Sequence, residues 1–178
     1  DDLILVIQDN GEFYTTNFDS SNHYQGSVRV IEKFDPNKIW SAALFDADQQ
    51  SYPYLKRFAF EVSNNKKQSL LGDNSESKLI LITDTVYPRV EVTFGGHDSF
   101  REALIIEVEE FIGIKSFKAK GKRISTFNVA EIKEIEPARF PEPEVEEASQ
   151  SDIDIEPEDD DKSPDELLDE ITGQQRLF

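Results

Sequence analysis

The chain has 178 residues, enough for one sizeable domain followed by a tail, and it contains no Cys, which excludes disulfides and thiolate metal sites. Its formal net charge of −18 argues against a nucleic-acid partner, but the charge is unevenly distributed. Residues 141–178 hold 15 Asp and Glu against 2 Lys and Arg, whereas residues 1–140 have a net charge of only −5.

The apolar runs of the chain predict no membrane partner. No apolar run approaches the ~20 residues that span a bilayer, and no signal peptide is visible. The chain begins with Asp1 and contains no Met, so we expect a fragment of a longer protein whose catalytic domain lies elsewhere. The absence of Cys suits the reducing cytoplasm, which is the location we expect.

The first 140 residues predict an all-β domain. Apolar and β-branched runs indicate strands at residues 3–7, 12–18, 27–32, 38–45 and 54–62, and Asp9, Asn10 and Gly11 indicate a hairpin turn between the first two. Residues 63–77 are mostly polar and are predicted to form a loop. The expected inward positions are Val28, Val30, Ile39, Ala43, Phe45, Phe58 and Phe60.

Internal repetition indicates how these strands are arranged. Residues 3–18 align without gaps on residues 79–94, each with an apolar strand, a polar break and a returning strand. Residues 54–62 parallel residues 120–129, where Lys-Arg is again followed by alternating apolar residues. A duplicated four-stranded unit, at about 1–77 and 78–140, predicts blades of a β-pinwheel or propeller.

No convincing catalytic or metal constellation is present. His23 and His97 lie in polar loop contexts, and Asp46 and Asp48 lack the Gly and distal Glu of a calcium loop, so a turn is the better interpretation. No phosphate-binding Gly-rich loop and no nucleophile elbow appear. We therefore predict no catalytic residue, no metal ligand and no cofactor in this chain.

One acid-free run stands out in this acidic chain. Residues 111–127, called the basic segment below, are predicted to form a hairpin turning near 119–121, with Ile112, Ile114, Phe117, Ile124 and Phe127 largely inward. Its exposed cations would suit a phosphate backbone, and Lys56 and Arg57 would occupy the equivalent place in the first repeat. A solvated face that maintains solubility is the alternative. The candidate DNA-binding residues are Lys115, Lys118, Lys120, Lys122, Arg123, Lys56 and Arg57.

Residues 141–178 are predicted to be a disordered acidic tail, because they are rich in Pro, Glu, Asp and Ser. A short amphipathic helix is expected near Leu167, Leu168 and Ile171. The last five residues resemble the Gln-x-x-Leu-Phe peptide by which bacterial replication proteins bind the sliding clamp. Gln174 would then supply an orienting amide hydrogen bond, while Leu177 and Phe178 would fill an apolar pocket. The alternative is that the last residues fold back onto the short helix or fray.

The phrase EEFIGIKSFKAKGKRISTFNVAEIKEIEP, residues 109–137, resembles the last blade of the A-type chain of bacterial topoisomerase IV. Residues 1–18 and 28–48 are similar to the preceding blade. The chain lacks the Gln-Arg-Arg-Gly-Gly-Lys-Gly box of gyrase, of which residues 24–29 are at most a degenerate remnant, so the resemblance favours topoisomerase IV. In that family a C-terminal β-pinwheel binds DNA on its outer rim.

The resemblance implies a non-catalytic domain of a type IIA topoisomerase, which binds or bends duplex DNA and presents it to the catalytic core for decatenation and relaxation. Implied partners are duplex DNA, the catalytic core of the same polypeptide, the B-type chain of topoisomerase IV and, through the last residues, the sliding clamp. The parent isomerase would use ATP and Mg²⁺ and act on the bacterial nucleoid during chromosome segregation. The alternative functions are a β-propeller-like protein-interaction module with an acidic tail and, more weakly, a stand-alone enzyme.

Overall fold

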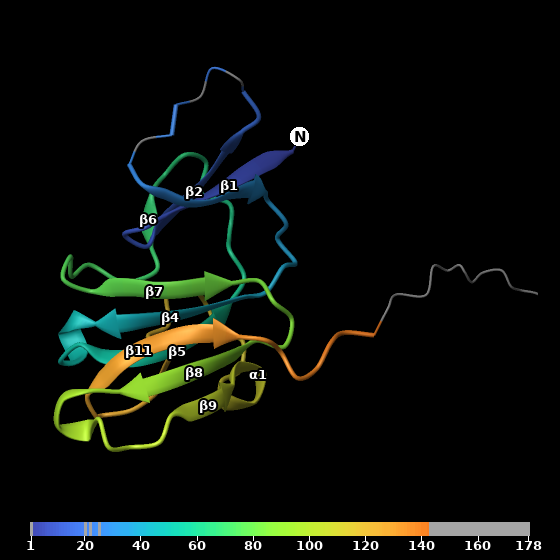
Figure 1. Ribbon diagram of the computed structural model, residues 1–178. Helices are drawn as coiled ribbons and strands as arrows, with labels where there is room; N and C mark the ends of the chain where they lie inside the picture. The colour runs from blue at the N-terminus through green and yellow to red at the C-terminus, as the bar shows by residue number, and fades with distance from the viewer. Residues whose placement is uncertain (1, 20, 22, 25, 143–178) are drawn as a thin grey trace, which may run out of the picture. The chain divides into compact units, whose positions relative to one another are not determined.

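The computed structural model describes residues 2–19, 21, 23–24 and 26–142. Residues up to Phe140 belong to one compact unit. Residues 143–178 of the predicted disordered tail, with its short helix and the clamp-like peptide, lie outside the described residues. The unit is built of three antiparallel sheets with little helix, which confirms the predicted all-β class. Sheet B lies between sheets A and C in Figure 1.

Sheet A is built around the predicted first hairpin. Gly11 has φ +86° and its amide donates to the Gln8 carbonyl at 3.0 Å, so the turn falls where Asn and Gly placed it. Strands pair in the order β3-β1-β2-β6, with the short β6 contributed by the loop predicted at 63–77. The strands are β1 (Leu3–Gln8), β2 (Glu12–Asn17), β3 (Val28–Lys33) and β6 (Gln68–Ser69).

Sheet B is buried on both faces. Along β4, Trp40, Ala42 and Leu44 join the cluster shared with sheet A, while Ala43 joins the cluster shared with sheet C. This double burial explains why β4 is an almost continuous apolar run rather than an alternating one. The order is β10-β5-β4-β7, from β4 (Trp40–Asp46), β5 (Tyr52–Phe58), β7 (Lys78–Thr83) and β10 (Lys122–Arg123).

Sheet C has one buried face and one outer face that carries two ion pairs beside the exposed Ile105. Val90, Val92 and Ile106 pack inward, whereas on the other face Arg89 pairs with Glu107 at 2.8 Å and Lys133 with Glu91 at 3.5 Å. The strand order is β11-β8-β9, from β8 (Arg89–Phe94), β9 (Leu104–Glu107) and β11 (Val129–Ile135). The turns are η1 (Ala47–Gln49), η2 (Gly96–Asp98) and the four-residue α1 (Val108–Phe111).

The strand pairing yields three similar units where the sequence alignment predicts two. Hairpins β1–β2, β4–β5 and β8–β9 are each extended by a later strand, β3, β7 or β11, which pairs with the first strand of its hairpin. The aligned ranges 3–18 and 79–94 are therefore not equivalent, because β1 and β2 pair together whereas β7 and β8 belong to different sheets. Both contain two apolar strands at similar spacing, and that pattern does not encode the strand partners.

Two hydrophobic clusters, among the described residues, join the sheets. The cluster between sheets A and B contains Phe13, Phe58, Phe60 and Phe117, whose ring centroids lie 4.7 to 5.0 Å apart in successive pairs. Predicted inward residues Ala43, Phe58 and Phe60 are buried; Val28, Val30, Ile39 and Phe45 are half-buried. The loop predicted at 63–77 also contributes Leu70 and Leu71, two core residues that its overall polarity concealed.

Candidate nucleic-acid interface

The basic segment does not form the predicted hairpin. It leaves α1, runs along the edge of β5 and pairs with it through β10, Lys122 lying opposite Leu55 and Arg123 opposite Tyr54. The Lys115 amide donates to the Arg57 carbonyl at 2.9 Å and the Ile124 amide to the Pro53 carbonyl at 2.7 Å. The edge of β5 thus supplies the backbone partners that a second hairpin strand would have supplied.

Apolar side chains fix the basic segment at two points. Phe117 is 2% exposed in the cluster between sheets A and B, and Ile112 is buried in the cluster between sheets B and C. Ile124 is half-buried, but Ile114 is 54% exposed and Phe127 is 43% exposed, contrary to the inward prediction for both. The prediction failed because it assumed strand alternation across a segment that is mostly loop.

Lys56 lies inside the fold, which is at odds with its predicted role in contacting DNA. Its residue is 4% exposed, because alternation along β5 places it on the same face as Tyr54 and Phe58. The ammonium donates to the Leu70 carbonyl at 2.7 Å and also to the Phe117 carbonyl. Burial lowers the pKa of Lys56 from 10.5 to about 8, with attraction from Asp46 opposing the shift.

Arg57, the other cation predicted on this strand, also holds the basic segment in place. It is half-buried on the opposite face of β5, and its Nη1 donates to the Ile112 carbonyl at 3.1 Å. The two Lys-Arg pairs of the sequence therefore lie on the paired strands β5 and β10 rather than at equivalent places in two blades. The apolar neighbours Tyr54, Leu55 and Phe58 on the same strand were the sequence signal that could have separated these two residues from the surface set.

The five cations of the basic segment are all exposed. Lys122 donates to the Phe111 carbonyl at 3.2 Å and lies 4.4 Å from the centre of that ring, and Arg123 lies 5.5 Å from the ring of Tyr52. The Lys120 Nζ atom lies 3.9 Å from Oδ2 of Asp46. Contact with the rings limits the rotamers of Lys122 and Arg123 while leaving their charges accessible to an anion. The structure thus brings Lys115, Lys118, Lys120, Lys122 and Arg123 together on one segment.

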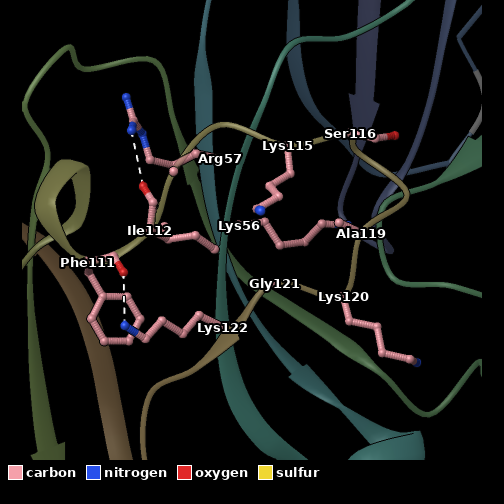
Figure 2. Close-up of a pocket in the computed structure, with 11 residues that line it drawn as sticks. Lys56, Arg57, Phe111, Ile112, Lys115, Ser116, Ala119, Lys120, Gly121 and Lys122 are labelled. Carbon is pink, nitrogen blue, oxygen red and sulfur yellow. Dashed lines mark hydrogen bonds between the residues drawn. The ribbon is translucent and has the colours of Figure 1, made fainter.

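A cavity of about 360 Å³ lies between the basic segment and β5. Figure 2 shows Lys122 extending toward Phe111 at one side and Lys120 extending in the opposite direction. Lys56, Arg57 and Lys115 also line it. This concave site was not visible in the sequence, because it depends on the basic segment crossing β5.

Of the residues considered as metal ligands in the sequence, Asp46, Asp48 and His97 lie at turns of the structure. Asp46 caps η1 by accepting the Asp48 amide at 3.0 Å, and His97 lies in the exposed turn η2. Within the described part of the chain, no group of three or more His, Asp or Glu side chains could share a metal ion. No helical segment there has the length and apolar character of a membrane span.

Comparison with known proteins assigns the family. The family model described as "Topoisomerase C-terminal domain, Bacteroidota" matches residues 1–136, about three quarters of the chain. The chain belongs to this family. No curated protein and no solved structure matched the chain. The Bacteroidota topoisomerase C-terminal domain is thus an accessory domain of an enzyme class that acts on DNA, and its all-β architecture agrees with that placement.

Gly121 tests how closely the basic segment must approach β5. It has φ +93°, and a Cβ at this position would meet the Leu55 carbonyl oxygen and lie 2.8 Å from Lys56 Cγ. We expect Gly121→Ala to lower the free energy of unfolding by at least about 2 kcal/mol, because left-handed strain and overpacking add. Gly113→Ala is the matched control, since its Cβ would meet nothing within 4 Å. Denaturant unfolding of both variants measures the difference, and equal stabilities would contradict the close approach.

The lowered pKa of Lys56 makes the stability of the domain depend on pH. The unfolded chain keeps the proton on Lys56 up to about pH 10.5, whereas the folded domain releases it near pH 8. Between these values the unfolded state binds more protons, so raising the pH stabilises the folded state through this group, by at most about 1.4 kcal/mol per pH unit. The unfolding free energy of the wild type should therefore rise relative to Lys56→Met from pH 8 to 10. Parallel curves for the two proteins would contradict the lowered pKa.

Proposed function

We propose that this domain binds duplex DNA without sequence preference through the basic segment. In this proposal it serves the A-type chain of topoisomerase IV, a type IIA enzyme, by binding or bending DNA and presenting it to the catalytic core for decatenation and relaxation. The observation that carries the proposal is the exposure of all five cations between Lys115 and Arg123 on a segment held against β5.

Fixed geometry supports phosphate binding by this segment. Hydrogen bonds from Lys115 and Ile124 to β5, together with the buried Phe117, order the backbone before any ligand arrives. Less conformational entropy is then lost on binding than with a free basic tail. Cations that replace condensed counterions on DNA give affinity that depends on salt rather than on base sequence.

The wider assembly follows from the resemblance to topoisomerase IV. The partners would be duplex DNA, the catalytic core of the same polypeptide and the B-type chain of the enzyme, and the parent isomerase would act in chromosome segregation on the bacterial nucleoid in the cytoplasm. Its ATP and Mg²⁺ would bind outside this domain. The acidic residues 141–178 would compete with DNA for the basic segment, because a tether gives them a high effective concentration.

A triple substitution tests DNA binding by the basic segment. Changing Lys118, Lys120 and Lys122 to Ala should weaken binding and flatten the slope of log affinity against log salt by about 0.9 for each phosphate that is no longer neutralised. The control changes Lys33, Lys66 and Lys67 to Ala, which removes the same charge from exposed sites outside the segment. Mobility shifts at several salt concentrations measure both proteins. Equal affinities and slopes for the two triple variants would remove the basic segment from the interface.

Deletion of residues 141–178 tests the competing tail. Removal of its net charge of −13 should tighten DNA binding at low salt and have a smaller effect at high salt, because salt screens the tail from the cations. The same mobility shifts compare the two lengths of chain. Unchanged affinity at every salt concentration would leave the tail as a solvating linker.

The last residues test the sliding-clamp proposal. A fluorescent peptide of residues 163–178 should bind purified clamp with modest affinity, since a free tail loses conformational entropy on binding. Changing Leu177 and Phe178 to Ala should abolish the anisotropy signal, because both side chains would fill the apolar pocket. Equal signals from the two peptides, or none from either, would refute this interaction.

A further inference from the structure

The cavity between the basic segment and β5 has an unusual charge for an acidic protein. Five of its lining residues are Lys or Arg, and no Asp or Glu is found among the described residues that line it. Two of the five, Lys56 and Arg57, come from β5, and the others come from the basic segment. A lining with five cations and no carboxylate favours a compact anion over a cation or a neutral ligand in this cavity.

The cations of the cavity differ in how many hydrogen bonds their side chains already donate to the protein. Lys56 donates to two backbone carbonyls, Arg57 to one, and Lys122 to the Phe111 carbonyl. Lys115 uses its backbone amide to hold the segment on β5, and its ammonium makes no hydrogen bond or ion pair with any described residue. Lys115 is therefore the cation that a bound anion would meet with all three donors available.

The other wall of the cavity is apolar. Phe111 and Ile112 line it beside Gly113, which leaves open space because a Cβ there would meet nothing within 4 Å. A volume of about 360 Å³ falls in the range of small-molecule sites, which combine apolar walls with a few placed polar groups. A ligand with both a phosphate group and a flat apolar group would use both walls.

We propose that this cavity binds a nucleoside diphosphate, with its phosphates at Lys115 and the neighbouring cations and its base against Phe111 and Ile112. This goes beyond DNA binding, because the ligand is a small molecule held inside the cavity, which three of the exposed cations, Lys115, Lys120 and Lys122, also line. The buried Lys56 contributes one of the positive charges behind the site. Arg57 and Lys56 hold the two walls together, so the site is formed before the ligand binds.

Three ligands separate the parts of the proposal when the full chain is titrated calorimetrically at low salt. ADP should bind, inorganic pyrophosphate should bind more weakly, and adenosine should not bind at millimolar concentration. This order follows because the phosphates meet the cations and the base adds packing against Phe111 and Ile112. No ADP binding at millimolar concentration, or ADP binding no tighter than pyrophosphate, would overturn the proposal.

Matched variants locate the site. Lys115→Gln should weaken ADP binding about tenfold, the loss expected for a charge-assisted hydrogen bond, whereas Lys118→Gln removes the same charge outside this cavity and should change ADP affinity less than twofold. Gly113→Glu adds a carboxylate to the wall and should abolish binding. Thermal unfolding checks that each variant folds. Equal losses from Lys115→Gln and Lys118→Gln would show diffuse attraction and overturn the site.

The same variants keep this proposal separate from DNA binding. On an exposed ridge, Lys115→Gln and Lys118→Gln should weaken DNA binding by similar amounts, because each removes one cation from a phosphate. DNA mobility shifts beside the ADP titrations therefore report the two functions independently. If Lys115→Gln weakens ADP binding but leaves DNA binding unchanged, the proposal of DNA binding at Lys115 fails. If it weakens DNA binding but leaves ADP binding unchanged, the nucleotide site fails.

Discussion

The position of the basic segment depends on one buried lysine. Lys56 enters the cluster between sheets A and B and donates to the carbonyls of Leu70 and Phe117, which belong to two separate segments. An ammonium in an apolar environment is costly unless its hydrogens are accepted, and these carbonyls would themselves be costly if left unpaired. Lys56 and the two carbonyls therefore require each other, and this mutual requirement fixes the loop at 63–77 and the basic segment against the same strand.

Sheet B makes that arrangement possible because neighbouring sheets cover both of its faces. The side chains of β4 and most of those of β5 are covered, whereas Lys122 and Arg123 are exposed on the edge strand β10. The basic segment occupies the edge of β5 and covers backbone groups that would otherwise be open to pairing with another chain. Edge protection and the display of cations thus come from the same residues, which explains why the exposed cations lie on a segment integrated with the core.

The strands were predictable from the sequence, but their partners were not. Alternation and turn residues located β1, β2, β3 and β4 to within a few residues. The first turn followed from Asn10 and Gly11, which tolerate positive φ, and Gly11 adopts it. The pairing of β7 with β4 rather than β8 depends on tertiary packing, which similar apolar runs do not specify. The five surface cations were identified from their acid-free run, whereas the buried Lys56 and the cavity require knowing that the segment crosses β5.

The ion pairs on the outer face of sheet C disfavour stacking a further sheet on that face. Stacking another sheet on Arg89, Glu107, Glu91 and Lys133 would bury two ion pairs, and their desolvation would offset much of the gain from packing. Sheet C therefore behaves like the capping repeat of a linear repeat protein, whose polar outer side ends the stack and keeps it soluble. The stack can therefore end at sheet C without closing into a ring on that side.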